Sequence, residues 1–382
     1  MLDDSLIQYY RSQFEVVKHS IYLNHAGVAP TSKLCVDAVT QWMNRLCETG
    51  IRAAMEGEET CGVTRSAAAQ LIGAKSSEIA FVRNTSHGLG LVAEGLSWCL
   101  GDEVVVAREL EYPSNVYPWL HLQRRGVVLS QLIPESGVVT LRAVENAVTE
   151  KTRLVALSGV QFANGTKAEM AKIGAFCRTR DILFCVDGIQ WVGTEEIDVH
   201  AIGIDFLSAD SHKWMLGISG IGFLFVNERC FEQLEPVLVG WKSTEDAFNF
   251  DRVHFVLKAD AQRYEEGSAS YPLIAGFREA LDMLLKVGVG NIQQRIKLLH
   301  RVLEETLKDE TYIFSPPLQW RGGSLFLRLP DAAKTEALYQ HLQEKNVVTS
   351  LRRGAIRISP HFYNTPEELE KTAKLISEFS GI

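Results

Sequence analysis

Three polar side chains that follow predicted strands indicate chemistry on an amine. Lys213 follows an apolar strand that begins near Asp205, while Asp187 and Gln190 follow the preceding strand. A lysine amine forms a Schiff base with an aldehyde, and a carboxylate beside a ring nitrogen keeps that ring protonated as an electron sink. A lone lysine after a strand is usually a surface residue. With an acid and an amide at the neighbouring strand end, the better interpretation is a site for pyridoxal phosphate (PLP).

A phosphate group binds where backbone amides converge. Segment 83–90 (Arg-Asn-Thr-Ser-His-Gly-Leu-Gly) follows a predicted strand and opens a helix, which supplies amides and the positive end of the helix dipole. Thr85 and Ser86 add hydroxyl donors. Gly88 and Gly90 lack the third glycine and the acid of a dinucleotide fingerprint, so a reductase is disfavoured.

Two further residues fit a cofactor or substrate role from their surroundings. Tyr112 follows a predicted strand, where its ring can stack on a flat heterocycle, although a core or turn role fits equally well. Arg357 lies inside the apolar strand 355–359, where a guanidinium requires a bidentate carboxylate partner. Either a substrate carboxylate or an internal acid satisfies that requirement.

Composition restricts the class of protein. The chain has 382 residues, 46% of them apolar and 23% charged, which is enough for a large and a smaller domain. Its net charge of -8 comes from interspersed acids and bases, so neither nucleic acid nor a membrane is an expected partner. The acidic start, without a signal-like segment, predicts a cytoplasmic location. Seven cysteines without a Cys-x-x-Cys pair disfavour a metal site and a disulfide framework.

Short apolar runs alternate with helix-like segments, which predicts a mostly parallel sheet covered by helices on both faces. Only about a dozen residues separate the run that ends at Ser208 from the last run, which begins at Gly220. That is too few for a long crossover helix, so we expect the last strand to be antiparallel and the sheet to be mixed. The predicted strands are 78–83, 103–108, 127–133, 153–160, 181–187, 205–208 and 220–226. We expect an N-terminal segment (1–20) packed on the smaller domain, a large domain (21–250) and a smaller α+β domain (251–382). The last of these has helices near 273–286 and 291–307 and strands near 324–329 and 355–359.

Taken together and in this order, eight segments resemble the class V aminotransferase family of fold-type I PLP enzymes. The branch they resemble contains group II cysteine desulfurases, cystine lyase, kynureninase and isopenicillin N epimerase. The segments are 22–27, 83–86, 111–113, 186–190, 211–214, 240–243, 263–268 and 357–365. The resemblance implies an α/β fold, with a mixed seven-stranded sheet in a large domain and a smaller α+β C-terminal domain.

The resemblance also implies roles for individual residues. Lys213 bonds the cofactor and later removes the α proton, Asp187 pairs with the pyridinium, Gln190 bonds the ring hydroxyl, and Tyr112 stacks on the ring. The phosphate side is assigned to Thr85, Ser86, the amide of His87, Asp210 and His212, with Ser268 reaching it from the partner subunit of a homodimer. Arg357 clamps the substrate carboxylate, and Asn24, His25 and Gln161 line the substrate side.

Three departures from the family pattern bear on the reaction. No cysteine occurs between Phe231 and Ile382, whereas group II desulfurases carry their persulfide-forming cysteine shortly before the arginine that matches Arg357. Asp210 replaces a small hydroxyl residue beside the phosphate, where an anion repels a dianion unless another group intervenes. Gln161 and Phe162 occupy the place of a usual asparagine.

The predicted reaction begins with Cα deprotonation of a small α-amino acid, and the same residues allow several outcomes. We expect transamination. The alternatives are carbon–sulfur β-elimination of the cystine or cysteine lyase type without persulfide transfer to the enzyme, epimerisation, and PLP binding without turnover.

Overall fold

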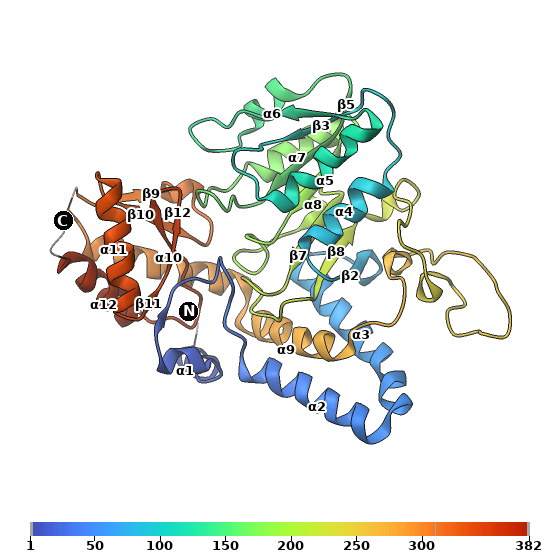
Figure 1. Ribbon diagram of the computed structural model, residues 1–382, viewed down its shortest axis with the longest axis horizontal. Helices are drawn as coiled ribbons and strands as arrows, with labels where there is room; N and C mark the ends of the chain where they lie inside the picture. The colour runs from blue at the N-terminus through green and yellow to red at the C-terminus, as the bar shows by residue number, and fades with distance from the viewer. Residues whose placement is uncertain (1–2, 310, 380–382) are drawn as a thin grey trace.

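A mixed seven-stranded sheet lies at the centre of the larger part of the molecule (Figure 1). The computed structural model describes residues 3–309 and 311–379. The strand order is β2-β8-β7-β6-β5-β3-β4, and only β8 runs antiparallel to its neighbours. The strands are β2 (Ile79–Val82), β3 (Glu103–Val106), β4 (Val128–Gln131), β5 (Thr152–Ser158), β6 (Leu183–Asp187), β7 (Phe206–Asp210) and β8 (Gly222–Val226). The predicted fold class and the antiparallel last strand are confirmed.

Both faces of this sheet are covered, which explains why β6, β7 and β8 are buried along their whole length and mostly apolar. Successive side chains such as Phe184 and Cys185 belong to two different hydrophobic clusters, one on each face. One cluster includes α4 (Thr85–Gly95) and α5 (Tyr117–His121). The other includes α3 (Ile51–Ile72), α6 (Leu141–Ala147), α7 (Met170–Thr179), α8 (Val199–Ile202) and α9 (Tyr271–Val287). Helix α2 (Lys33–Thr49) packs on α3 and α9.

The smaller part of the molecule has its own sheet and its own apolar core. Its antiparallel strands follow the order β12-β13-β10-β9. They are β9 (Ile313–Ser315), β10 (Leu325–Arg328), β12 (Ser350–Arg352) and β13 (Ala355–Ile358). Leucines of α10 (Val289–Thr306), α11 (Ala332–Glu344) and α12 (Pro366–Ser377) fill the core under this sheet. A short strand near the N-terminus, β1 (Ile21–Tyr22), pairs with β11 (Val347–Val348) of the smaller part.

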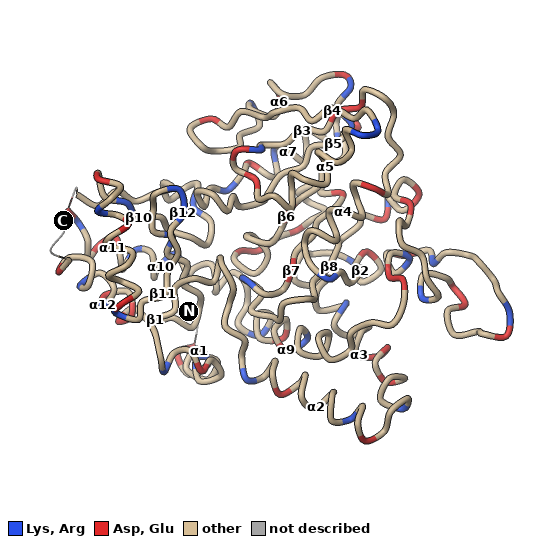
Figure 2. Tube along the Cα trace, in the orientation of Figure 1, with Lys and Arg blue, Asp and Glu red and all other residues tan. Residues whose placement is uncertain are grey.

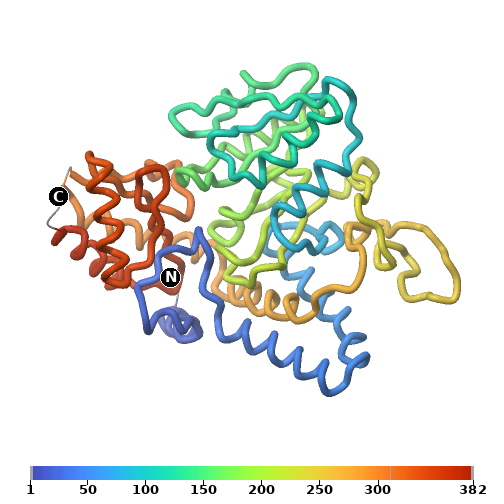
Figure 3. The backbone as a smooth tube through the Cα atoms, in the orientation of Figure 1, coloured from blue at the N-terminus to red at the C-terminus, as the bar shows by residue number. Residues whose placement is uncertain are grey.

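The N-terminal helix α1 (Asp4–Arg11) lies beside the last elements of the chain (Figure 3). Arg11 pairs with Glu368 at 2.7 Å, and the ring of Phe14 stacks on Tyr363 with centroids 4.0 Å apart. Helix α9 packs on α2 and α3, so contacts of the larger part continue to Val287. The boundaries at 20 and 250 stay predictions, and residues 1, 2, 310 and 380–382 of the predicted domains lie outside the described residues.

Acidic and basic residues are interspersed along the chain trace (Figure 2), as the sequence indicates. Within residues 3–309 and 311–379, no helix has both the length and the apolar character needed to cross a membrane.

Candidate active site

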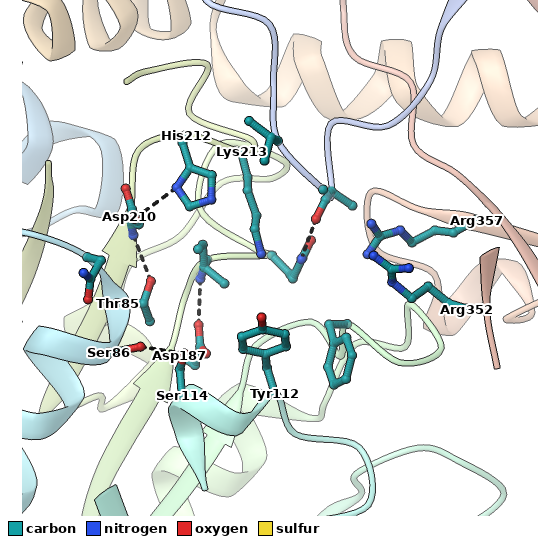
Figure 4. A pocket seen from close by; sticks show the side chains of 17 residues that line it. Thr85, Ser86, Tyr112, Ser114, Asp187, Asp210, His212, Lys213, Arg352 and Arg357 are labelled. Carbon is teal, nitrogen blue, oxygen red and sulfur yellow. Dashed lines mark hydrogen bonds and ion pairs between the residues drawn. The ribbon is translucent and has the colours of Figure 1, made fainter. Parts of the chain in front are cut away.

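A cavity of about 330 Å³ opens at the carboxyl ends of β6 and β7 (Figure 4). Strand ends of a parallel sheet meet at one edge, which is where ligands of such folds bind. Residues from the larger part, from segment 26–28 and from the smaller part together line it. The cavity has two chemically different ends, because Thr85, Ser86, Asp210 and His212 lie at one end and Arg352 and Arg357 at the other, with Lys213 between them.

Lys213 points into the middle of this cavity from the loop after β7. Its Nζ atom lies 5.6 Å from the ring centroid of Tyr112. Burial lowers the pKa of Lys213 to about 8, although the Asp187 carboxylate opposes the decrease and Arg357 adds to it. About a tenth of Lys213 is therefore uncharged and nucleophilic at pH 7, far more than for an exposed lysine.

Asp187 is the last residue of β6 and is almost completely buried. Its Oδ1 atom accepts a hydrogen bond from the Ile189 amide at 3.0 Å. Burial raises the pKa of Asp187 to about 7; the Ile189 hydrogen bond opposes this increase, and nearby Glu111 adds to it. A buried carboxylate without a cation is poorly stabilised, so a protonated ring nitrogen placed here is favoured and in turn keeps the acid ionised.

Gln190 fixes the segment that carries Lys213. Its Nε2 atom donates to the Ala26 carbonyl at 3.0 Å, and its Oε1 atom accepts from Trp214 Nε1 at 2.8 Å. An amide nitrogen carries two hydrogens, so Nε2 keeps one donor for the ring hydroxyl that the resemblance assigns to it.

The phosphate end is formed by the start of α4 and the end of β7. Asn84 caps α4 by accepting from the His87 amide at 2.9 Å, and Thr85 Oγ1 accepts from the Asp210 amide at 3.0 Å. Ser86 Oγ lies 2.7 Å from Ser114 Oγ. The His87 amide is thus engaged by the cap, and the His87 side chain lines a different cavity. Ser114 also lines the site and was not predicted from sequence.

Tyr112 lies at the mouth of the cavity on a loop that a buried acid anchors. Its ring meets Phe162 edge to face, with centroids 5.1 Å apart. The preceding residue, Glu111, accepts from the Ser158 amide and from Gln161 Nε2, both at 2.8 Å. Burial raises the pKa of Glu111. Gln161, predicted to contact substrate, is therefore bonded to Glu111 and does not line the cavity, whereas Phe162 does.

Arg357 and Arg352 define the opposite, basic end. Arg357 Nε donates to Ser350 Oγ at 3.1 Å, and Nη2 donates to Asn24 Oδ1 at 3.3 Å. Burial and the neighbouring Arg352 lower the pKa of Arg357 to about 10. Among residues 3–309 and 311–379, no carboxylate lies within ion-pair distance of either guanidinium. This end is therefore suited to a substrate carboxylate.

The other predicted residues lie near the site but not in it. Asn24 supports Arg357 from behind and is not among the residues that line the cavity. His25 is buried, with Nδ1 2.8 Å from the Ser359 carbonyl and Nε2 2.7 Å from the Tyr363 hydroxyl. Burial lowers the pKa of His25 well below its usual value, so it is a neutral structural residue in this arrangement. Ser268 lines a second cavity of about 320 Å³ together with Arg83 and His87.

This arrangement fits PLP at each of its groups. A nucleophilic amine, a buried acid for the ring nitrogen, an aromatic ring at the cavity mouth and a helix N-terminus for phosphate surround one space. The fold and the site together define a PLP-dependent enzyme.

Comparison with known proteins identifies the family. The model of the family Aminotransferase class-V matches residues 21–372, and the chain belongs to this family. A probable cysteine desulfurase of Methanothermobacter thermautotrophicus is 29% identical, over 97% of this chain and 98% of that protein. An uncharacterized aminotransferase of Bacillus subtilis is 26% identical, over 96% of both chains. The structure of apo cysteine desulfurase from Thermococcus onnurineus is similar with a TM-score of 0.87 at 25% identity, over 97% of both chains.

The pKa of Lys213 can be tested in the protein without cofactor. Below its pKa the amine is protonated and unreactive, so trace acetylation of Lys213 by acetic anhydride, read by peptide mass spectrometry, should be half-maximal near pH 8. In Asp187→Asn this midpoint should fall further, because the carboxylate raises the pKa of Lys213. Exposed lysines in the same digest are the internal reference. A midpoint near the ordinary value of about 10.4 would contradict the account.

Proposed function

We propose that the protein is a carbon–sulfur β-lyase that acts on cystine or a closely related sulfur amino acid. The observation that carries this proposal is the segment before Arg357: it presents Arg352 to the cavity, where a group II desulfurase would carry its persulfide-forming cysteine. Relatives named as probable cysteine desulfurases favour C–S cleavage over the transamination that we expected from sequence. The transfer of sulfur to an enzyme thiol does not fit this site.

The positions of the cysteines support release of sulfur on a small molecule. None of the residues that line the cavity in the described chain is cysteine. Five of the seven cysteines are buried, and the exposed pair, Cys47 and Cys99, lie on α2 and after α4. The balanced reaction for cystine is cystine plus water giving pyruvate, ammonia and cysteine persulfide, in which no external oxidant or reductant is needed.

The side chains divide this reaction among themselves. PLP, when bound, supplies the electron sink that makes the Cα–H bond of an amino acid acidic. Arg357 binds the α-carboxylate, Lys213 Nζ accepts the Cα proton, and Asp187 holds the charge of the ring nitrogen. β-Elimination releases a thiolate-type leaving group, which needs a proton. Lys213 is the only lysine that lines the cavity in the described chain, and its amine can return that proton to sulfur.

Arg352 favours cystine over cysteine as the substrate. It is exposed, lines the same end of the cavity as Arg357 and lowers the pKa of Arg357, which places two cations close together. Cystine has two carboxylates, and the second lies on the half that leaves with sulfur. A second guanidinium at the cavity rim is suited to bind it.

Product analysis with the PLP-loaded protein tests the function. With L-cystine we expect pyruvate and cyanide-reactive sulfur in equal amounts, without any added keto acid. The double variant Cys47→Ala/Cys99→Ala should keep this activity within about twofold, because no enzyme thiol takes part. Formation of alanine from pyruvate with an amino donor, with no sulfur product from cystine or cysteine, would instead identify a transaminase, the second candidate that the Bacillus relative favours.

The assembly that supports the site is proposed to be a homodimer. Segment 236–260, called the arm below, projects from the side of the larger part away from the C-terminus (Figure 1). The arm exposes Val237, Leu238, Val239, Trp241, Phe248, Phe250, Val253, Phe255 and Val256, although monomers rarely expose so large an apolar patch.

At the base of the arm, Glu265 is bonded to buried Arg65 at 2.6 Å, which fixes the segment that carries Ser268. Ser268 does not line the Lys213 cavity of its own chain, so we propose that it lines the corresponding cavity of the partner subunit. A cytoplasmic location likewise stays a prediction.

Sedimentation equilibrium tests the dimer. We expect twice the chain mass of 42.6 kDa for the protein, and a shift to the monomer when the arm carries Phe248→Asp and Phe250→Asp. Leu318→Asp, an equally drastic change at an exposed site of the smaller part, should remain dimeric. A protein that sediments as a single 42.6 kDa species at micromolar concentration would contradict the proposal.

A further inference from the structure

A buried carboxylate stands at the phosphate end of the cavity, where simple electrostatics disfavours it. Asp210 is the last residue of β7, lines the cavity and is 5% exposed. Its Oδ1 atom is buried and has no hydrogen-bond partner among the described residues. A carboxylate in this position repels a phosphate dianion unless a neighbouring group compensates its charge.

The neighbour that compensates it is His212. Asp210 Oδ2 lies 3.0 Å from His212 Nδ1, which is ion-pair distance, and the two side chains are 6% and 19% exposed. Nδ1 is buried and makes no hydrogen bond of good geometry among the described residues, so the contact is one of charge when the ring is protonated. The backbone amide of Asp210 donates to Thr85 Oγ1 at 3.0 Å, which ties the end of β7 to the first residue of α4. Figure 4 shows the His212 ring between Asp210 and Lys213 in this view, and both Asp210 and His212 line the cavity.

This contact bears on which ring nitrogens of His212 carry a hydrogen. A proton on Nδ1 is the one that the Asp210 carboxylate attracts, so Nε2 also carries a hydrogen only if the imidazole holds both protons. A carboxylate on one side and a phosphate on the other both favour that charged ring. The charged pair then has no net charge and presents one strong N–H donor to the phosphate.

We propose that Asp210 is a positioning residue that holds His212 as a doubly protonated phosphate donor. A hydroxyl residue at this place would donate to the phosphate itself, whereas Asp210 acts through the ring. The inference rests on PLP binding alone and is independent of the reaction that follows. It explains why an acid is compatible with a site for a dianion. It also predicts that loss of the Asp210 charge weakens PLP binding, whereas direct repulsion predicts that this loss strengthens it.

Measurement of PLP binding to the protein without cofactor distinguishes these two effects of Asp210. Dissociation constants for PLP and for pyridoxal, which lacks the phosphate, are measured by visible absorption for the unmodified protein and for Asp210→Asn. The asparagine carbonyl can still accept from Nδ1, so only the charge is lost. We expect PLP affinity to fall about tenfold or more, as for a charge-assisted hydrogen bond, and pyridoxal affinity to stay within about twofold.

A second variant shows whether Asp210 acts through His212. His212→Gln should also weaken PLP selectively, and Asp210→Asn/His212→Gln should bind PLP no more weakly than His212→Gln alone, since the acid has then lost the group it orients. Thermal unfolding of each apo variant and its pyridoxal affinity report on folding. Equal or tighter PLP binding by Asp210→Asn, additive losses in the double variant, or equal losses for PLP and pyridoxal would each overturn the proposal.

Discussion

Burial of an amine and an acid in one cavity is the constraint on which the rest of this structure depends. Lys213 and Asp187 lose water at the ends of two strands, which brings their pKa values to about 8 and about 7. Burial of either charge alone would cost free energy, and each charge is stabilised by the other or by the charge of a bound ring. The buried strands β6 and β7 and the clamp from Gln190 to Trp214 keep these groups in place without closing the cavity.

The second organising feature is the polarity of the cavity. One end combines a helix N-terminus with the Asp210–His212 pair, and the other has two guanidiniums from the smaller part. An anion fits at both ends, but the donors differ: phosphate meets amides, hydroxyls and an imidazole, whereas a carboxylate meets planar guanidinium groups. In the proposed function this difference would orient cofactor and substrate across Lys213, and substrate binding would require the contact between the two parts of the molecule.

Sequence predicted the fold and the centre of the site because both depend on local pattern. Apolar runs that end in polar residues gave the strands, and Lys213, Asp187 and Gln190 followed from their positions at those ends. Residues whose partners lie far along the chain were not predictable in this way. His25 bonds Tyr363, 338 positions away, and Gln161 bonds Glu111, 50 positions away, so neither lines the cavity as expected. Arg352 was missed because its sequence context is that of a surface arginine. The fate of the deprotonated substrate depends on such rim residues, and for that reason we expected transamination from sequence, whereas the relatives favour C–S cleavage.

Lys213 is the amine that we propose bonds PLP in this cavity. Borohydride reduction of the PLP-loaded protein, followed by digestion and peptide mass spectrometry, tests it directly because reduction makes the bond permanent. We expect a phosphopyridoxyl group on the peptide that contains Lys213 and no such group in Lys213→Ala. A protein that takes up no PLP, or a modification confined to other lysines, would contradict it.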